Sequence, residues 1–271
     1  MDKISSEQWR MIQQYVYRNG RLLERQLFEC FFGRGSPEAC LRALRAYQNP
    51  DGGFGNGIEP DLLCPESSAI GAETAMFVLD VLEVRPREIV DPLLEWIVTH
   101  QSDAGTIPHP PPAIADYPHQ PWWEGPDDSR VLTLAGYLGK WGIAHESFSA
   151  RVRGYYETLD VPEADSYYGY PYFVYLKYCA QTDGDWAKWE TMTGQVPAIL
   201  KGHTDHFPLF SRAWYHAGES VPRETVEAEA GKFIAAIQED GSLDAPYPEL
   251  PWWRPIWTVD GLVLLKRASV V

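Results

Sequence analysis

The amino-acid sequence predicts an all-α protein of one domain, in which about eleven helices form a ring of helix hairpins. Apolar residues recur at helical spacing along most of the 271-residue chain, whereas the turn signals of β-hairpins are scarce. Residues that favour helix starts, chiefly Ser, Asp and Pro, precede many of these segments. Long and short connections also alternate, which is typical of antiparallel helix hairpins linked by longer, site-building loops.

The first four helices follow from apolar spacing and from the residues at their starts. We expect Ser36 to cap the second helix, Ser67 or Ser68 to cap the third, and Asp91 to open the fourth. These helices are expected at residues 7–30, 36–48, 67–84 and 91–101.

The helices expected in the rest of the chain begin with the same kinds of residue. Asp128, Asp185 and Pro222 mark helix starts. The remaining helices are expected at residues 128–140, 145–159, 167–181, 185–200, 207–217, 222–238 and 255–268. The long loops are residues 49–66, 102–127 and 239–254.

Composition restricts the classes of partner. A net charge of −15 disfavours nucleic-acid binding and a polybasic membrane anchor, since both need a basic surface. No run of 18 apolar residues and no apolar signal core at the N-terminus are present, so we expect a cytoplasmic protein without a transmembrane segment. The four cysteines form no Cys-x-x-Cys pair, which predicts free thiols. We expect a small-molecule ligand, and the net charge favours a cationic or neutral one over an anionic one.

Two internal repeats support a single domain of related units. Gln48-Asn-Pro-Asp-Gly52, Gln101-Ser-Asp-Ala-Gly105 and Gln238-Glu-Asp-Gly241 each end a predicted helix. The second repeat pairs residues 117–123 with residues 247–253, which share a Tyr-Pro-x-x-Pro-Trp-Trp pattern.

Residues 48–54, Gln-Asn-Pro-Asp-Gly-Gly-Phe, resemble the Gln-x-x-Asp-Gly-Gly-Trp/Phe element of the terpenoid cyclase and protein prenyltransferase superfamily, which includes squalene-hopene cyclase-like proteins. The resemblance implies an α/α toroid of about five to six helix hairpins, in which each such turn joins an outer to an inner helix. It places residues 67–84 and 128–140 on the inner layer. Close sequence similarity covers only residues 45–82, and the rest of the chain is similar as helix-pair architecture.

In that family, loops entering the inner helices surround a central cavity, and the matching loops here are rich in carboxylates and aromatic rings. The resemblance therefore implies an acidic, aromatic-lined cavity with Asp61 or Glu59 as the acid and Asp165 as a further catalytic candidate. If Asp61 faces this cavity, we expect burial to raise its pKa. The expected ligand contacts are Phe54, Tyr117, Trp122, Trp123, Tyr168, His206, Trp252, Trp253, Arg254 and Trp257.

Three functions remain open from the sequence. A terpenoid cyclase or prenyltransferase-like protein would bind an isoprenoid-type ligand and stabilise a carbocation with aromatic rings. A carbohydrate-active hydrolase or lyase would pair carboxylates and stack sugars on Trp. A non-catalytic binding module would keep the scaffold alone, so whether the chain is an enzyme stays open.

The stronger signatures of the superfamily are missing. Residues 125–128, Gly-Pro-Asp-Asp, lack the first carboxylate of the cyclase Asp-x-Asp-Asp motif. A prenyltransferase-like zinc set could be drawn from Asp61, Cys64 and either His203 or His206, but the spacing is not that of the family. We therefore expect no metal and no cofactor.

Overall fold

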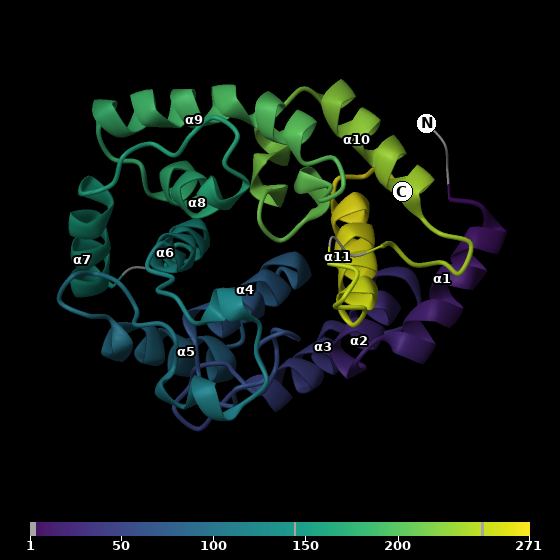
Figure 1. Cartoon of the computed structure of the whole chain (residues 1–271), viewed down its shortest axis with the longest axis horizontal. Coiled ribbons are helices and arrows are strands. Elements are labelled where there is room, and N and C mark those ends of the chain that lie inside the picture. Colours follow the sequence, from purple (N-terminus) through teal and green to yellow (C-terminus); the bar gives the residue numbers. More distant parts are fainter. Residues whose placement is uncertain (1–3, 144, 245–246) are drawn as a thin grey trace. The chain divides into compact units, whose positions relative to one another are not determined.

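The computed structural model describes residues 4–143, 145–244 and 247–271. Over these residues the chain forms eleven α-helices and six short 3₁₀ helices, with no β-strand, which confirms the all-α prediction (Figure 1). Outside them lie residues 1–3, residue 144, and residues 245–246 of the long loop predicted at 239–254. In the described part of the chain, no helix combines the length and apolar character needed to span a bilayer.

The chain divides into two compact units, one of Met1–Leu44 with Val196–Val271 and one of Arg45–Gln195. The toroid and the single domain stay predictions. The central unit contains η1 (Arg45–Tyr47), α4 (Ala69–Leu82), α5 (Arg87–His100), η2 (Pro112–Asp116), η3 (Pro121–Trp123), α6 (Arg130–Trp141), α7 (Glu146–Glu157), η4 (Tyr167–Gly169) and α8 (Tyr170–Cys179). The division falls inside α9 (Asp183–Gly202).

Helix α6 packs between α4 and α8 and forms the middle of the central unit (Figure 1). Ser68 caps α4, because its hydroxyl accepts a hydrogen bond of 3.1 Å from Gly71 N, as the sequence predicted. Every residue of α4 is buried, so this helix is surrounded by protein. Glycine at position 136 allows α6 to approach α8, since a Cβ there would lie 2.6 Å from the Val174 side chain.

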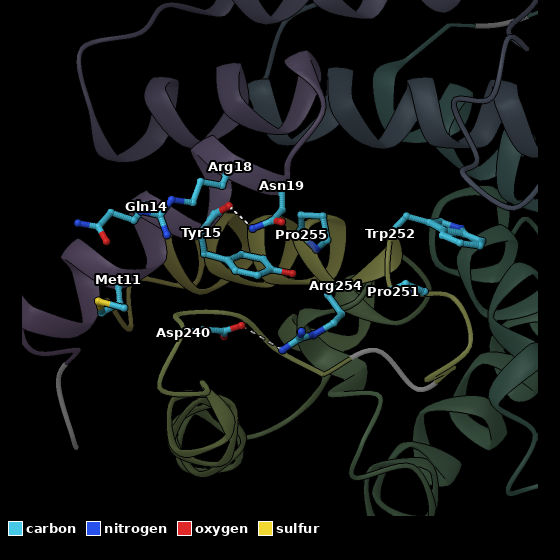
Figure 2. Close-up of a pocket in the computed structure, with 10 residues that line it drawn as sticks. All are labelled: Met11, Gln14, Tyr15, Arg18, Asn19, Asp240, Pro251, Trp252, Arg254 and Pro255. Atoms are coloured by element: carbon cyan, nitrogen blue, oxygen red, sulfur yellow. Dashed lines mark hydrogen bonds and ion pairs between the residues drawn. The ribbon is translucent and has the colours of Figure 1, made fainter.

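The terminal unit joins the two ends of the chain. It contains α1 (Ser6–Asn19), α2 (Leu22–Phe32), α3 (Pro37–Leu44), η5 (Pro208–Phe210), η6 (Tyr215–Ser220), α10 (Arg223–Ala236) and α11 (Trp253–Arg267). Helix α2 packs against α1, α3 and α11, while η5 contacts α10 and α11. Between α1 and the segment that enters α11 lies an open cleft with a volume of about 610 Å³ (Figure 2).

Three glycine turns share one geometry and confirm the first internal repeat. Gly52, Gly105 and Gly241 have φ values of 90°, 90° and 89°, a region that disfavours side chains. Each glycine N–H donates to the carbonyl three residues earlier, at 2.9, 3.0 and 2.9 Å. A Cβ on them would lie 2.3 Å from Pro92 O, 2.3 Å from Arg151 O and 2.4 Å from Ile12 N, respectively. Only glycine allows each turn to lie directly against a neighbouring helix.

The third turn aligns differently from the prediction. In the first two turns a glutamine side chain fixes the backbone. Gln48 Nε2 donates to Gly52 O at 3.0 Å and to a carbonyl of α5. Gln101 Nε2 donates to Gly105 O at 3.0 Å and to a carbonyl of α7. In the third turn the backbone bond from Gln238 N to Ser242 O, 2.8 Å long, matches the bond from Asn49 N to Gly53 O. Ile237 therefore occupies the position of Gln48, and the matching of Gln238 with Gln48 is wrong by one residue.

We expect Gly105→Ala to lower the free energy of unfolding by about 2–4 kcal/mol. The alanine backbone would be strained at this positive φ, and its Cβ would clash with Arg151 O. Urea unfolding followed by circular dichroism measures this. Gly154→Ala is the matched control, since a Cβ on this glycine of α7 meets nothing within 4 Å, and it is expected to be neutral or stabilising. Equal effects of the two substitutions would contradict the proposed role of the turn.

Three predicted helices differ from the structure. Residues 7–30 form two helices, because Gly20 and Arg21 are extended and the Gly20 N–H ends α1 on Val16 O. The fourth helix begins at Arg87 and contains Pro92, so Asp91 does not open it. Residues 207–217 form only 3₁₀ turns, because Phe207 is left-handed with a φ of 44°.

The start of α9 depends on the Asp185 carboxylate, which accepts hydrogen bonds from Arg153 Nη1, Gln181 N and Thr182 N at 2.7, 2.9 and 3.0 Å. Burial raises the pKa of Asp185, but these hydrogen bonds outweigh it and hold the pKa below its ordinary value. A lowered carboxyl pKa stabilises the fold above the unfolded-state pKa, near 3.9, and this contribution is lost as the pH falls toward the folded-state pKa.

We therefore expect Asp185→Asn to cost about 2–3 kcal/mol of unfolding free energy at pH 7 and less as the pH falls below about 4. The urea unfolding midpoints of the wild-type and Asp185→Asn proteins, measured between pH 7 and below pH 4, test whether the stability deficit shrinks toward acid pH. A deficit that grows toward acid pH would show that the carboxylate charge is not the stabilising feature.

Candidate functional site

The loop after the first glycine turn carries Glu59 and Asp61, and backbone hydrogen bonds fix it on both sides. Gly55 N donates to Tyr47 O at 3.0 Å. Across the loop, Leu63 N donates to Pro118 O at 2.9 Å, and a bond of 3.0 Å runs from Gln120 N to Asp61 O. Two of the long loops predicted to build a site therefore pair with each other.

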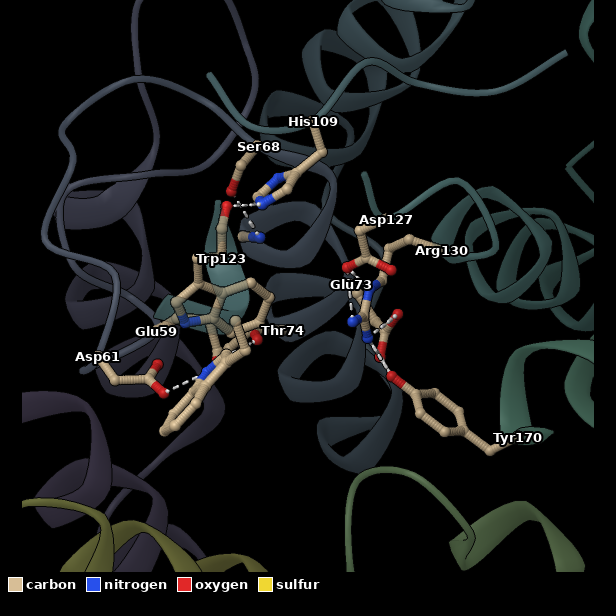
Figure 3. A network of polar contacts seen from close by, with 12 residues as sticks. Glu59, Asp61, Ser68, Glu73, Thr74, His109, Trp123, Asp127, Arg130 and Tyr170 are labelled. Atoms are coloured by element: carbon tan, nitrogen blue, oxygen red, sulfur yellow. Dashed lines mark hydrogen bonds and ion pairs between the residues drawn. The ribbon is translucent and has the colours of Figure 1, made fainter. Parts of the chain in front are cut away.

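Both predicted acids are buried beside a donor side chain. Glu59 and Asp61 are each 5% exposed. The hydroxyl of Thr74, on α4, donates to Glu59 Oε1 (Figure 3). Trp122 Nε1 donates to Asp61 Oδ2 at 3.2 Å, and the Trp122 ring is 46% exposed. A buried carboxylate thus lies at the edge of an accessible aromatic ring.

Trp123 lies on the inner side of the same turn. It packs with Leu62, Cys64, Ile70 and Ile114 in an apolar cluster. Because a carbonyl oxygen only accepts, the contact of 3.0 Å between His109 Nε2 and Trp123 O requires the proton on Nε2. Burial lowers the pKa of His109, so its ring stays neutral. Among the described residues, His109 Nδ1 and Trp123 Nε1 are buried without a hydrogen-bond partner.

A buried ionic network adjoins this cluster on α4, α6 and α8. Arg130 Nη1 donates to both carboxylate oxygens of Glu73 at 3.1 Å, and its Nη2 donates to Asp127 Oδ2 at 2.7 Å (Figure 3). The Tyr170 hydroxyl donates to Glu73 Oε1 at 2.9 Å and also contacts Arg130 Nη1. Burial raises the pKa of Glu73, and the charge of Arg130 opposes this. The network links α4, α6 and α8 close to Thr74, which is also on α4.

The second repeat is confirmed as a local structure. Trp123 N and Trp253 N each donate to the carbonyl three residues earlier at 3.0 Å. The first tryptophan of each pair, Trp122 and Trp252, is 46% exposed. The second tryptophan of each pair is directed inward in its own unit, and among the described residues the Nε1 atoms of both have no hydrogen-bond partner.

The other predicted residues lie in several places. Phe54 is fully buried as a core side chain, and Tyr117 and Tyr168 are 39% and 70% exposed. Asp165 is exposed in the loop before η4. In the terminal unit, the rings of His206 and Trp257 lie 5.8 Å apart, Arg212 lies 6.0 Å from the Trp253 ring, and Trp252 and Arg254 line the cleft. The structure therefore brings together Glu59, Asp61, Trp122 and Trp123 within the central unit.

The zinc alternative gains no support from the cysteine. Burial raises the pKa of Cys64, which keeps its thiol protonated within the apolar cluster. In the part of the chain that the structure describes, no group of three or more His, Cys, Asp or Glu side chains is placed to hold a metal ion.

Sequence reasoning missed Glu73 and, in the terminal unit, Tyr15 and Asp260. Glu73 and Asp260 lie on helices that are mostly apolar, where a buried charge requires a partner. Arg212 Nε supplies that partner to Asp260 at 2.6 Å. A carboxylate inside an otherwise apolar helical segment was the available signal.

Comparison with known proteins finds no matching protein-family model, curated sequence or solved structure. An inference about function therefore depends on the sequence and on the geometry described above.

Proposed function

We propose that this chain is a terpenoid cyclase or prenyltransferase-like α/α toroid protein that binds an apolar, isoprenoid-type ligand and transforms it with a carboxylic acid. The observation that carries the proposal is the burial of Asp61 beside the accessible ring of Trp122, directly after the Gln-Asn-Pro-Asp-Gly-Gly-Phe turn. The acid and the aromatic face are the two groups that cation chemistry requires.

In this mechanism the proton of the Asp61 carboxyl moves to one carbon of an alkene, whose π electrons form the new C–H bond. The other carbon becomes a cation, which the face of an aromatic ring stabilises. The carboxylate that remains keeps the hydrogen bond from Trp122 Nε1. Loss of a proton from a carbon next to the cation forms a new double bond and returns the proton to the carboxylate, so the acid is regenerated.

Glu59 is the alternative acid, because it is equally buried and its carboxylate is positioned by the hydroxyl of Thr74. The backbone hydrogen bonds between the two loops support a preorganised site, since one of them runs from Gln120 N to the carbonyl of Asp61.

A second candidate is a carbohydrate-active hydrolase or lyase. The exposed ring of Trp122 beside Asp61 favours it, because sugar rings stack on exposed tryptophan while paired carboxylates act on the glycosidic bond.

The test is a direct assay of the purified protein. Squalene and geranylgeranyl diphosphate are incubated with it and products are identified by mass spectrometry, in parallel with oligosaccharide hydrolysis and lyase assays. The proposal expects conversion of an isoprenoid. Conversion of oligosaccharides alone would favour the second candidate, and isoprenoid binding without conversion would indicate a non-catalytic module.

A further inference from the structure

The cleft of the terminal unit lies apart in sequence from the acids of the central unit. Its walls include Gln14, Tyr15 and Asn19 of α1, Asp240 of the third glycine turn, and Trp252 and Arg254 at the start of α11 (Figure 2). Its volume of about 610 Å³ is within the range of sites for small molecules.

One wall presents aromatic and proline surface. Trp252 remains 46% exposed, while Tyr15 is 9% exposed and forms the floor beneath Arg254, whose guanidinium carbon lies 5.6 Å from the Tyr15 ring centre. The prolines on either side of Trp252 and Arg254, Pro251 and Pro255, also line the cleft and limit movement of the segment. An exposed indole held on such a segment is a platform for stacking.

Hydrogen bonds within the protein orient two polar side chains of the cleft, Arg254 and Asn19. Arg254 Nε donates to Leu243 O at 3.2 Å, and its Nη2 contacts Asp240 Oδ2 at 3.5 Å and the hydroxyl of Ser242. Within the described part of the chain these contacts use Nε and Nη2, which leaves Nη1 as a donor. Asn19 Nδ2 donates to Tyr15 O at 2.9 Å, which orients its amide and leaves the side-chain oxygen as an acceptor.

The charges at the cleft balance only when a carboxylate beside it is counted. Arg18, Arg254 and Asp240 line the cleft, and Asp244, which is not part of the lining, lies 3.3 Å from Arg254 Nη2 and offsets the remaining positive charge. A phosphate or a polycation would therefore find no net charge to bind, whereas a neutral ligand with many hydroxyls would find both donors and acceptors.

We propose that this cleft is a binding site for a neutral saccharide of one to three sugar units, with Trp252 stacking on a sugar face and Gln14, Asn19, Asp240 and Arg254 bonding its hydroxyls. The combination of an exposed indole with planar polar side chains carries this assignment, since a sugar offers an apolar face and a rim of hydroxyls. This site adds to the proposed function and does not rest on it.

The experiment is calorimetric titration of the full chain with maltotriose, cellotriose, xylotriose and chitotriose, each up to about 10 mM, where even weak affinities are measurable. We expect at least one to bind and Trp252→Ala to weaken that binding about tenfold or more, the scale of one lost stacking contact. Gln14→Ala should weaken it severalfold.

Trp186→Ala is the matched control, because Trp186 is 49% exposed on α9 outside the cleft, and it should leave binding unchanged. Asp61→Asn should also retain saccharide binding, which separates this site from the acid of the central unit. Absence of binding by all four saccharides would overturn the proposal. Equal losses in the Trp252 and Trp186 variants would do the same.

Discussion

Under the proposed function, Asp61→Asn is expected to leave the protein folded and to lower turnover of an isoprenoid ligand by about 10²–10⁴-fold, the usual contribution of a general acid. Asparagine has nearly the same shape, and its Oδ1 still accepts the hydrogen bond that Trp122 Nε1 gives to Asp61 at 3.2 Å. It carries no proton that it can transfer, so the chemical step is lost while the loop stays in place. Product formation and thermal unfolding are measured on the same preparation.

The control for this variant is Glu66→Gln, which removes a carboxylate from the same loop at an exposed position. Glu66 Oε2 accepts a bond of 3.1 Å from Ala113 N, and glutamine keeps an acceptor there, so little change is expected in activity or stability. If Asp61→Asn lowers the melting temperature but not the turnover, Asp61 is a structural loop carboxylate and the proposed acid is wrong. A loss confined to Glu59→Gln would assign the acid to Glu59.

Arg130→Met is expected to produce the largest loss of stability, about 3–5 kcal/mol in the free energy of unfolding, because it leaves the carboxylate of Glu73 buried without its cation. Glu73 is 6% exposed, and Arg130 Nη1 contacts both of its carboxylate oxygens at 3.1 Å. Methionine fills a similar volume, so the lost charge dominates the effect. Urea unfolding at several pH values measures it.

The pH dependence of this loss has a definite sign. Without Arg130, burial raises the folded-state pKa of Glu73 above the unfolded value of about 4.3. A raised carboxyl pKa leaves stability intact below the unfolded-state pKa and removes it as the pH rises through the folded-state pKa. The deficit of Arg130→Met should therefore be smaller at pH 4 than at pH 8.

Two controls distinguish the buried pair from a general effect of removing arginine. Arg87→Met breaks an exposed ion pair of 3.3 Å with Asp91, in which Arg87 is 89% exposed, and should change stability by no more than about 0.5 kcal/mol. Adding Glu73→Gln to Arg130→Met should recover part of the loss, since a neutral amide costs less to bury. A double variant as unstable as the sum of the single variants would contradict the pairing.

Local sequence signals predicted most helices correctly because their causes are local. Ser68 caps α4 through its own hydroxyl, and Pro37 begins α3. Two helix predictions were wrong because the backbone conformation of one or two residues ended or prevented the helix. Gly20 and Arg21 interrupt a continuous apolar pattern, and the left-handed Phe207 prevents a helix over residues 207–217.

For the site, the sequence located the loops but not the contacts. It pointed to Glu59, Asp61 and the paired tryptophans, and the structure buries both carboxylates and positions Trp122 on Asp61. Glu73 was missed although its place on a mostly apolar helix signalled a buried charge, because its partner Arg130 lies far along the chain and only the structure pairs them.

The sequence by itself determined the all-α class, the glycine turns and the repeated Pro-Trp-Trp segments, because these depend on periodicity, on capping and on conformations that only glycine adopts easily. Tertiary structure alone decided which side chains meet. The partners of Glu73 and Asp260 and the cleft beside Trp252 arise from contacts between segments distant in sequence. Such contacts are fixed by packing and by the requirement that buried polar groups find partners, which no local pattern records.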